Sequence, residues 1–492
     1  MTLQFPRFPK IHKIRLDLPR FQCYTSVVSI ERTEDAMENQ KQDMGTGSIK
    51  QWMLQLAVPA VVAQVINLLY NIVDRIYLGH IPGIGGLALT GVGLFTPILM
   101  LITAFAMLAG AGGAPRAAIA MGEGNREKAE KIMGNCFAVL MILAVVLTIV
   151  FYKFCPDLIR LFGGSDATLP YALEYANIYI CGSVFVLIVM GMNPFITTQG
   201  FAKTSMLTTV IGAVINIVLD PILIFGLNLG VSGAALATIL SQAVSACWIL
   251  SFLRGKKAIL KLRPANMKLI PAIIGPCLGL GVSSFVMVST ESILSISFTS
   301  SLARFGGDVA VGAMTVLTSI NQLVTMPLNG ICQGGQPLIS FNYGAKKLER
   351  VKEAFFCQFA VCVGYTAVFW LLLMAAPRMF AGIFTSDTAL VSYAAWAMRI
   401  YFACAFSIGF QMSCQQAFMA LGQAKMCLFM ACLRKIILLI PLIFILPVFL
   451  ADKAFAVFLA EPVSDFIAAA VTTGLFFRFF ARMLKEGKTA QQ

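Results

Sequence analysis

The amino-acid sequence predicts an all-α integral membrane protein, with twelve transmembrane helices arranged as two six-helix lobes related by a pseudo-twofold axis along the membrane normal. Composition, the charge of the segments between apolar stretches, and an internal repeat lead to this fold class. Of 492 residues, 58% are hydrophobic and only 12% are charged. Soluble domains contain about 45–50% apolar and about 25% charged residues, so the composition indicates a membrane protein.

The net charge of +14 does not indicate nucleic-acid binding, because the Lys and Arg residues fall between the apolar stretches. The 13 cysteines are scattered without a CxxC motif, and the chain has two histidines. These counts predict neither a disulfide framework nor a metal centre built from Cys and His.

Apolar stretches long enough to cross the hydrocarbon core, which takes about 20 helical residues, occur twelve times in the chain. They cover residues 52–78, 87–112, 132–152, 171–193, 204–227, 232–253, 270–300, 309–335, 353–375, 388–418, 425–450 and 455–480.

The charge of the connections supports this number. If the N-terminus is placed in the cytoplasm, the connections on the cytoplasmic side hold most of the Lys and Arg residues, as cytoplasmic loops do. An odd number of crossings would disturb the alternation, so both termini are expected in the cytoplasm. The connections on the outer side hold only Lys153, Arg160, Arg304, Arg378 and Lys453.

An internal repeat divides the chain in two. Shifted by about 222 residues, the sequence matches itself at Gly, Pro, Glu and Lys positions in both helices and loops. Six helices per repeat is an even number, so both halves insert with the same orientation and leave a cleft between them. Matched positions include Gly112 with Gly334, Pro115 with Pro337, Gly122 with Gly344, Glu127 with Glu349, and Lys203 with Lys425.

The repeat and the connections predict the organisation of the chain. We expect a basic, disordered N-terminal tail, two lobes, a cytoplasmic linker and a short cytoplasmic tail, with no function assigned to residues 1–36. The predicted units are residues 1–50, 51–253, 254–268, 269–483 and 484–492.

Asp220 is the acidic residue with the most informative neighbours. Asn216 and Asp220 are four residues apart and share a helix face. Pro221 has no N–H, so the carbonyl group of Ile217 lacks its helical partner. These oxygens fit a site for a hard cation or a proton. Ionisable groups inside a membrane are energetically costly and usually have a function. The alternative is an Asp/Asn pair bonded to a neighbouring helix at a kink.

Two further residues lie at a similar predicted depth. Thr238 in the sixth segment and Asp74 near the outer end of the first segment would share the outer half of the N-terminal lobe with Asp220. Asp74 also has an alternative interpretation: because it is next to Arg75, it could be a charged residue at the membrane interface.

The C-terminal lobe carries its own intramembrane charges. Glu291 lies in a polar patch of the seventh segment, where a functional and a structural interpretation are equally open. Arg399, Arg434 and Lys435 also fall within apolar stretches. They could pair with acidic groups, line the cleft or extend to an interface.

Several motifs resemble those of the multidrug and toxic compound extrusion (MATE) family of bacterial type, over residues 45–480. They are Asn71–His80, Gly110–Gly122 with the following Glu-Gly-Asn, Asn216–Pro221, Gly233–Thr238, and Gln333–Pro337 through Asn342-Tyr-Gly. The resemblance implies that Asp74, Asn216, Asp220 and Thr238 form a cation-coupling site. It also implies a possible second coupling acid, Glu291, although the helix-8 position that is often His in those branches is Met314 here.

The function that this resemblance implies is secondary active efflux: export of organic cations or drugs in exchange for inward Na⁺ or H⁺ by alternating access. The chain would then be no enzyme, would use no cofactor besides the coupling ion, and would work as a monomer in the plasma membrane among lipids. The alternative is a lipid-linked oligosaccharide flippase of the same superfamily, whose cleft should display several Arg or Lys residues. A channel or receptor would not need two symmetric lobes with a buried acid.

Overall fold

The computed structural model describes residues 43–385 and 387–489, which are helical apart from short connections. Within this part of the chain, ten helices are long and apolar enough to cross a membrane, and the bent pair α11 (Thr388–Tyr401) and α12 (Phe406–Ala420) makes an eleventh crossing. A twelfth comes from α8 (Pro271–Gly344), whose 74 residues would span about 110 Å as one straight helix, far more than a bilayer needs.

The break in α8 lies at Gly307, whose φ of 65° and ψ of −165° are not helical. Glycine adopts such a conformation readily because it has no Cβ. The two parts of α8 correspond to the predicted segments 270–300 and 309–335. The predicted twelve-helix fold is therefore confirmed over the described residues.

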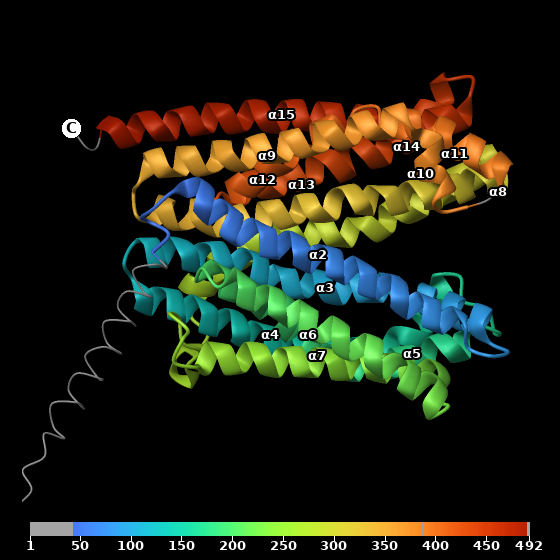
Figure 1. Ribbon diagram of the computed structural model, residues 1–492, viewed down its shortest axis with the longest axis horizontal. Coiled ribbons are helices and arrows are strands. Elements are labelled where there is room, and N and C mark those ends of the chain that lie inside the picture. Colours follow the sequence, from blue (N-terminus) through green and yellow to red (C-terminus); the bar gives the residue numbers. More distant parts are fainter. Residues whose placement is uncertain (1–42, 386, 490–492) are drawn as a thin grey trace, which may run out of the picture.

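The helices form two lobes, and Figure 1 shows α3 to α7 on one side and α9 to α15 on the other, with α2 and α8 between them. The first lobe contains α2 (Ile49–Gly79), α3 (Gly85–Gly122), α4 (Arg126–Leu161), α5 (Leu169–Thr198), α6 (Ala202–Pro221) with the π-helical turn η1 (Ile222–Gly226), and α7 (Gly230–Arg254).

The connection to the second lobe includes the short 3₁₀ helix η2 (Pro264–Met267). The second lobe contains α8 (Pro271–Gly344), α9 (Leu348–Ala375), α10 (Pro377–Gly382), α11 (Thr388–Tyr401), α12 (Phe406–Ala420), α13 (Ala424–Cys432), the π-helical segment η3 (Leu433–Leu439), α14 (Ile440–Phe449) and α15 (Lys453–Thr489).

The predicted tails are only partly described. Most of the predicted N-terminal tail, including residues 1–36, lies outside the described residues, whereas residues 43–48 form a turn that leads into α2 at Ile49. At the other end of the chain, α15 continues through Thr489.

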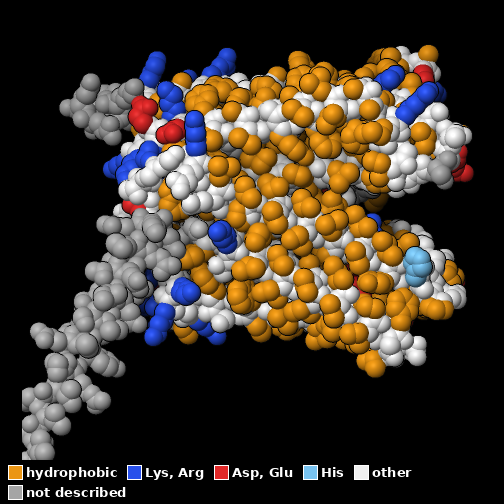
Figure 2. Space-filling view, in the orientation of Figure 1, with side chains coloured by type: hydrophobic (Ala, Val, Ile, Leu, Met, Phe, Trp, Pro, Cys, Tyr) orange, Lys and Arg blue, Asp and Glu red, His pale blue; other side chains and the backbone are white. Residues whose placement is uncertain are grey.

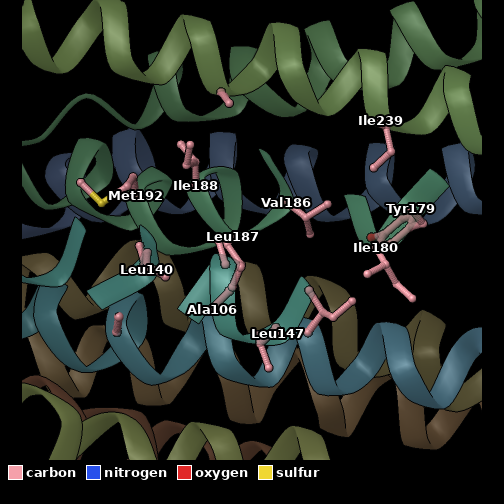
Figure 3. Packing of buried hydrophobic residues seen from close by; sticks show 14 of the residues in the cluster. Ala106, Leu140, Leu147, Tyr179, Ile180, Val186, Leu187, Ile188, Met192 and Ile239 are labelled. Carbon is pink, nitrogen blue, oxygen red and sulfur yellow. The ribbon is translucent and has the colours of Figure 1, made fainter. Parts of the chain in front are cut away.

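The core of the first lobe packs around α5, which contacts α3, α4, α6 and α7. Figure 3 shows Leu187 of α5 among side chains of its neighbours, including Leu147. Small residues let these helices approach closely: a Cβ atom on Gly110 would lie 2.7 Å from the backbone of Gly191, well inside van der Waals contact. Such close packing of small residues is typical of helices in membranes.

Basic side chains gather at one end of the molecule, which we call the basic end (Figure 2). At this end the two lobes touch. Away from it, the space-filling view shows a hollow between the lobes, which we call the cleft. The basic end includes Arg126, Lys256, Lys257, Lys261, Lys347 and Arg350.

The repeat places equivalent glycines at the contact between the lobes. A Cβ atom on Gly122 of α3 would collide with the carbonyl oxygen of Phe341, and one on Gly344 of α8 would collide with the carbonyl oxygen of Ile119. These two contacts are related by the shift of 222 residues, since Ile119 corresponds to Phe341. The pseudo-twofold relation therefore extends to the backbone contact that closes the basic end.

The segments that precede α2 and α8 are each held by helices across the repeat. Arg350 donates hydrogen bonds to the carbonyl oxygens of Gly47 (2.8 Å) and Met44 (3.1 Å). On the other side, buried Asn135 of α4 accepts a hydrogen bond from the Ile270 N–H (2.7 Å) and donates one to the carbonyl of Asn266 (3.2 Å).

Asn135→Ala should lower the stability of the protein. The substitution leaves a part-buried backbone N–H and a part-buried carbonyl group without their side-chain partner, which costs about 1 kcal/mol. A thermal melt in detergent should show a lower midpoint than that of Asn177→Ala, a matched change at an exposed position of α5. Equal midpoints for the two variants would show that Asn135 contributes nothing to the anchoring of α8.

Candidate functional site

The clustered polar groups of the first lobe lie in the half away from the basic end. Asn216 and Asp220 are fully buried on α6, and Thr238 is buried on α7. The Asn216 side-chain amide donates to a carboxylate oxygen of Asp220 and to the hydroxyl of Thr238, each at 3.4 Å. The structure thus brings together the three residues that the spacing and depth of the sequence suggested.

Local backbone features place these side chains. Pro221 ends α6, and the chain continues as the π-helical turn η1 because the proline lacks an N–H for the helical hydrogen bond. Gly233 of α7 packs against this turn, where a Cβ atom would lie 2.8 Å from the Leu223 carbonyl oxygen. Glu174 of α5 accepts hydrogen bonds from the Ser232 hydroxyl (2.6 Å) and backbone N–H (3.2 Å) at the start of α7.

Asp74 joins the cluster from α2. It lies five residues before the end of α2, and its carboxylate is close enough to interact electrostatically with Asp220. One carboxylate oxygen of Asp74 is buried without a hydrogen-bond partner. Asp74 as a whole is half-buried and lies within electrostatic reach of Arg75, so its interpretation as an interfacial charge stays a prediction beside the coupling role.

Three oxygens in this cluster are buried and lack hydrogen-bond partners: Oδ1 of Asp74, Oδ1 of Asn216 and Oδ2 of Asp220. Buried polar groups are normally paired, and each unpaired one costs roughly 1–3 kcal/mol. Two neighbouring carboxylates with free oxygens therefore form a site suited to a small hard cation or a proton. We call Asp74, Asn216, Asp220 and Thr238 the N-lobe site.

Aromatic hydroxyl groups border the N-lobe site, and the sequence analysis missed them. Tyr70 of α2 interacts electrostatically with Asp74 and Asp220. Tyr175 of α5 lies close to Thr238 and stacks on Tyr179, with ring centroids 5.9 Å apart. The spacing of Tyr175 and Tyr179 by four residues in an apolar helix was the available signal.

The second lobe contains a network of oppositely charged side chains. Arg434 donates to Asp465 (2.7 Å) and to Glu461 (3.1 Å), both on α15. Lys435 forms an ion pair with Glu291 of α8 (3.0 Å). Arg434 and Lys435 thus pair with acidic groups, which was one of the three interpretations left open by the sequence. We call these five residues the C-lobe network.

The other two residues singled out in the second lobe lie apart from this network. Arg399 is exposed in the last turn of α11. Met314 is buried in the apolar core of the second lobe, so the position that often holds His in the resembled branches serves packing here.

Comparison with known proteins is consistent with this architecture. The MatE family model matches residues 59–222 and again residues 283–445. The chain is 23% identical to "Multidrug export protein MepA" of Staphylococcus haemolyticus, over 87% of this chain and 94% of the relative. It is also 23% identical to the protein of the same name from Staphylococcus aureus strain N315, over 80% and 86%.

Solved structures show the same fold. One is described as the outward-facing conformation of a multidrug resistance MATE family transporter of the MOP superfamily, with a TM-score of 0.84, 23% identity, and coverage of 90% of this chain and 98% of that one. Another is a MOP superfamily transporter from Pyrococcus furiosus, with a TM-score of 0.83, 23% identity, and coverage of 89% and 97%. The two matched repeats, the twelve-helix fold and these relatives establish that the chain is a multi-pass membrane protein belonging to the MATE family of multidrug efflux transporters, and hence a transporter and not an enzyme.

Proposed function

We propose that this protein exports organic cations or drugs in exchange for inward Na⁺ or H⁺. The observation that carries the proposal is the N-lobe site, where two carboxylates hold buried oxygens without partners. In a membrane such groups mark ion pathways. A cation or proton at Asp74 and Asp220 would satisfy the oxygens and remove the repulsion between the two carboxylates.

The arrangement of the lobes supports alternating access. The lobes touch through equivalent glycines at the basic end and separate at the cleft. Rocking of one lobe against the other would open the basic end and close the cleft. Because cytoplasmic loops carry the Lys and Arg excess, we place the basic end and both termini in the cytoplasm, with the cleft facing outward.

The donor set of the N-lobe site fits the coupling ion. Carboxylate, amide and hydroxyl oxygens suit Na⁺ or H⁺, and no nitrogen or sulfur ligand from His or Cys is needed. Glu291 is already paired with Lys435, so we assign ion coupling to the N-lobe site.

The flippase alternative has less support. A lipid-linked pyrophosphate needs free cationic side chains in the cleft, whereas Arg434 and Lys435 are both ion-paired with carboxylates of the same lobe. An organic cation carries the charge opposite to that of the N-lobe site, and we therefore prefer cations as cargo.

Transport of ethidium, a fluorescent organic cation, by the purified protein in proteoliposomes tests the proposal. The expected result is ethidium movement driven by an imposed Na⁺ gradient or an imposed proton gradient, against an ethidium concentration difference. Liposomes without protein provide the control. Movement that is equally fast without any ion gradient would rule out coupled export, and transport of a pyrophosphate-linked lipid in its place would favour the flippase.

A further inference from the structure

The Glu291–Lys435 ion pair joins an exposed group to a buried one. The side chain of Glu291 is 54% exposed, whereas that of Lys435 is only 7% exposed. Lys435 also donates a hydrogen bond of 2.7 Å to the carbonyl oxygen of Met287, one turn before Glu291 on α8. The ammonium group therefore approaches Glu291 from inside the lobe and leaves the other side of the carboxylate open.

Glu291 lies beside a contact between the two lobes. Contacts between α3 and α8 extend from Gly112 near the basic end to Ser292, whose hydroxyl lies 3.5 Å from the sulfur of Met100. Glu291, Ser295 and Thr299 follow one another at intervals of four residues, so they share a helix face. All three are exposed, and their neighbour Ser292 contacts α3 of the first lobe, which indicates that this face borders the cleft between the lobes.

Arg434 limits what the other acids of the network can bind. It holds Asp465 and one oxygen of Glu461 in buried ion pairs. The second oxygen of Glu461, Oε2, is buried and has no hydrogen-bond partner. Lys435 and Glu461 are close enough to interact electrostatically, and a lysine side chain is flexible. The free oxygen of Glu461 is thus an available second acceptor for Lys435.

The backbone of α13 and α14 brings the two cations together. Arg434 and Lys435 lie at the start of η3, and π-helical segments inside α-helices occur frequently at functional sites. In η3, Arg434 reaches α15 while Lys435 reaches α8. The segment therefore connects the cleft wall to the acidic pair on α15.

We propose that Glu291 is a binding site for the ammonium or other cationic group of the exported molecule, and that Lys435 is an internal competitor for this site. The inference rests on the proposed export of organic cations and specifies how cargo is selected. A cationic cargo that enters the cleft replaces Lys435 at Glu291, and Lys435 moves to the free oxygen of Glu461. Neutral and anionic molecules cannot make this exchange. Lys435 thereby sets how strongly a cationic cargo must bind to Glu291 in order to displace it.

Ethidium affinity of purified variants tests the exchange, measured by fluorescence anisotropy in detergent. Lys435→Met removes the competitor and should tighten ethidium binding about tenfold, since a tethered competitor acts at an effective concentration in the millimolar range. Glu291→Gln should weaken binding about tenfold. Lys425→Met, an exposed position on the preceding helix α13, is the matched control and should leave ethidium binding unchanged.

The double variant Glu291→Gln with Lys435→Met separates competition from a structural role. If Lys435 acts only through Glu291, removing it in the Glu291→Gln background should no longer tighten binding. Weaker binding by Lys435→Met, unchanged binding, or equal tightening in both backgrounds would each overturn the proposal. If the parent protein binds no ethidium, Lys435→Met should create binding, and its failure to do so would also count against the exchange.

These outcomes are distinct from a failure of the proposed function. Absence of gradient-driven transport in proteoliposomes would contradict coupled export, whatever the affinities are. Normal coupled transport together with an affinity that does not depend on Lys435 would leave export intact and reject only the exchange at Glu291.

Discussion

Asp220→Asn should strongly slow gradient-driven efflux while the protein remains folded. The substitution keeps the size of the side chain and its hydrogen bond with Asn216, but it removes the charge that a coupling ion would balance. Coupling free energies between sites are typically about 1–3 kcal/mol, or about 5- to 150-fold, so loss of coupling should slow driven transport by a factor in this range. The measurement is ethidium efflux from proteoliposomes under separate Na⁺ and proton gradients.

A matched variant controls for the loss of a carboxylate as such. Asp157 is exposed at the end of α4 away from the basic end, and Asp157→Asn should transport like the parent protein. A thermal melt of both variants checks folding. Normal efflux by Asp220→Asn under both gradients would show that the N-lobe site does not couple transport.

Leucine at Gly122 or Gly344 should hold the basic end open. Each side chain would collide with a backbone carbonyl of the opposite lobe in the closed contact, and overpacking of this kind costs about 1–3 kcal/mol. The cost applies only while the basic end is closed. Because 1.4 kcal/mol corresponds to a factor of ten, the population should shift roughly tenfold or more toward the inward-open state, and transport should fall accordingly.

The native thiol of Cys277 can be used to detect opening of the basic end, so no cysteine has to be introduced. It is fully buried on α8, where its backbone carbonyl meets Gly112 of α3. Opening of the basic end should expose it, and its modification by N-ethylmaleimide, followed by peptide mass spectrometry, should accelerate in both leucine variants. Gly364→Leu, on an open face of α9, should leave the rate unchanged. Unaltered labelling of Cys277 in the Gly122 and Gly344 variants would mean that this contact does not control closure.

The number of helices could be predicted because hydropathy and the charge of the loops are two independent indicators of it. The segment boundaries were shorter than the helices, since α2, α3 and α4 extend past the apolar stretches into polar ends. The repeat predicted more than topology: Gly122 and Gly344 were recognised as equivalent positions, and the structure places both at the same contact between the lobes.

The N-lobe site was predictable where its residues share a helix. Asn216 and Asp220 are four residues apart, so helical geometry alone aligns them. The contact with Thr238 depends on how α6 packs against α7, and the sequence offered only similar depth for it. The aromatic border formed by Tyr70, Tyr175 and Tyr179 could not be separated from ordinary packing or lipid-facing rings.

The C-lobe network could not be assembled from the sequence. Its charges were visible, but Arg434 meets Glu461 and Asp465 across the interface of η3 with α15. The rotation of two helices about their axes decides such pairs, and the π-helical turn changes that rotation at Arg434 itself. Hydropathy and residue spacing do not indicate how the two helices are rotated relative to each other.

Competition between cargo and coupling ion at equilibrium tests the central claim most directly. The dissociation constant of ethidium should be measured on the purified protein over a range of Na⁺ concentrations at fixed pH and ionic strength, and over a range of pH without Na⁺. If the N-lobe site couples export, one of these ions should weaken ethidium binding in the parent protein, because coupling between two ligands is reciprocal. The dependence should vanish in Asp220→Asn. An ethidium dissociation constant that changes with neither ion would contradict the account. The same ion dependence in Asp220→Asn as in the parent protein would also contradict it.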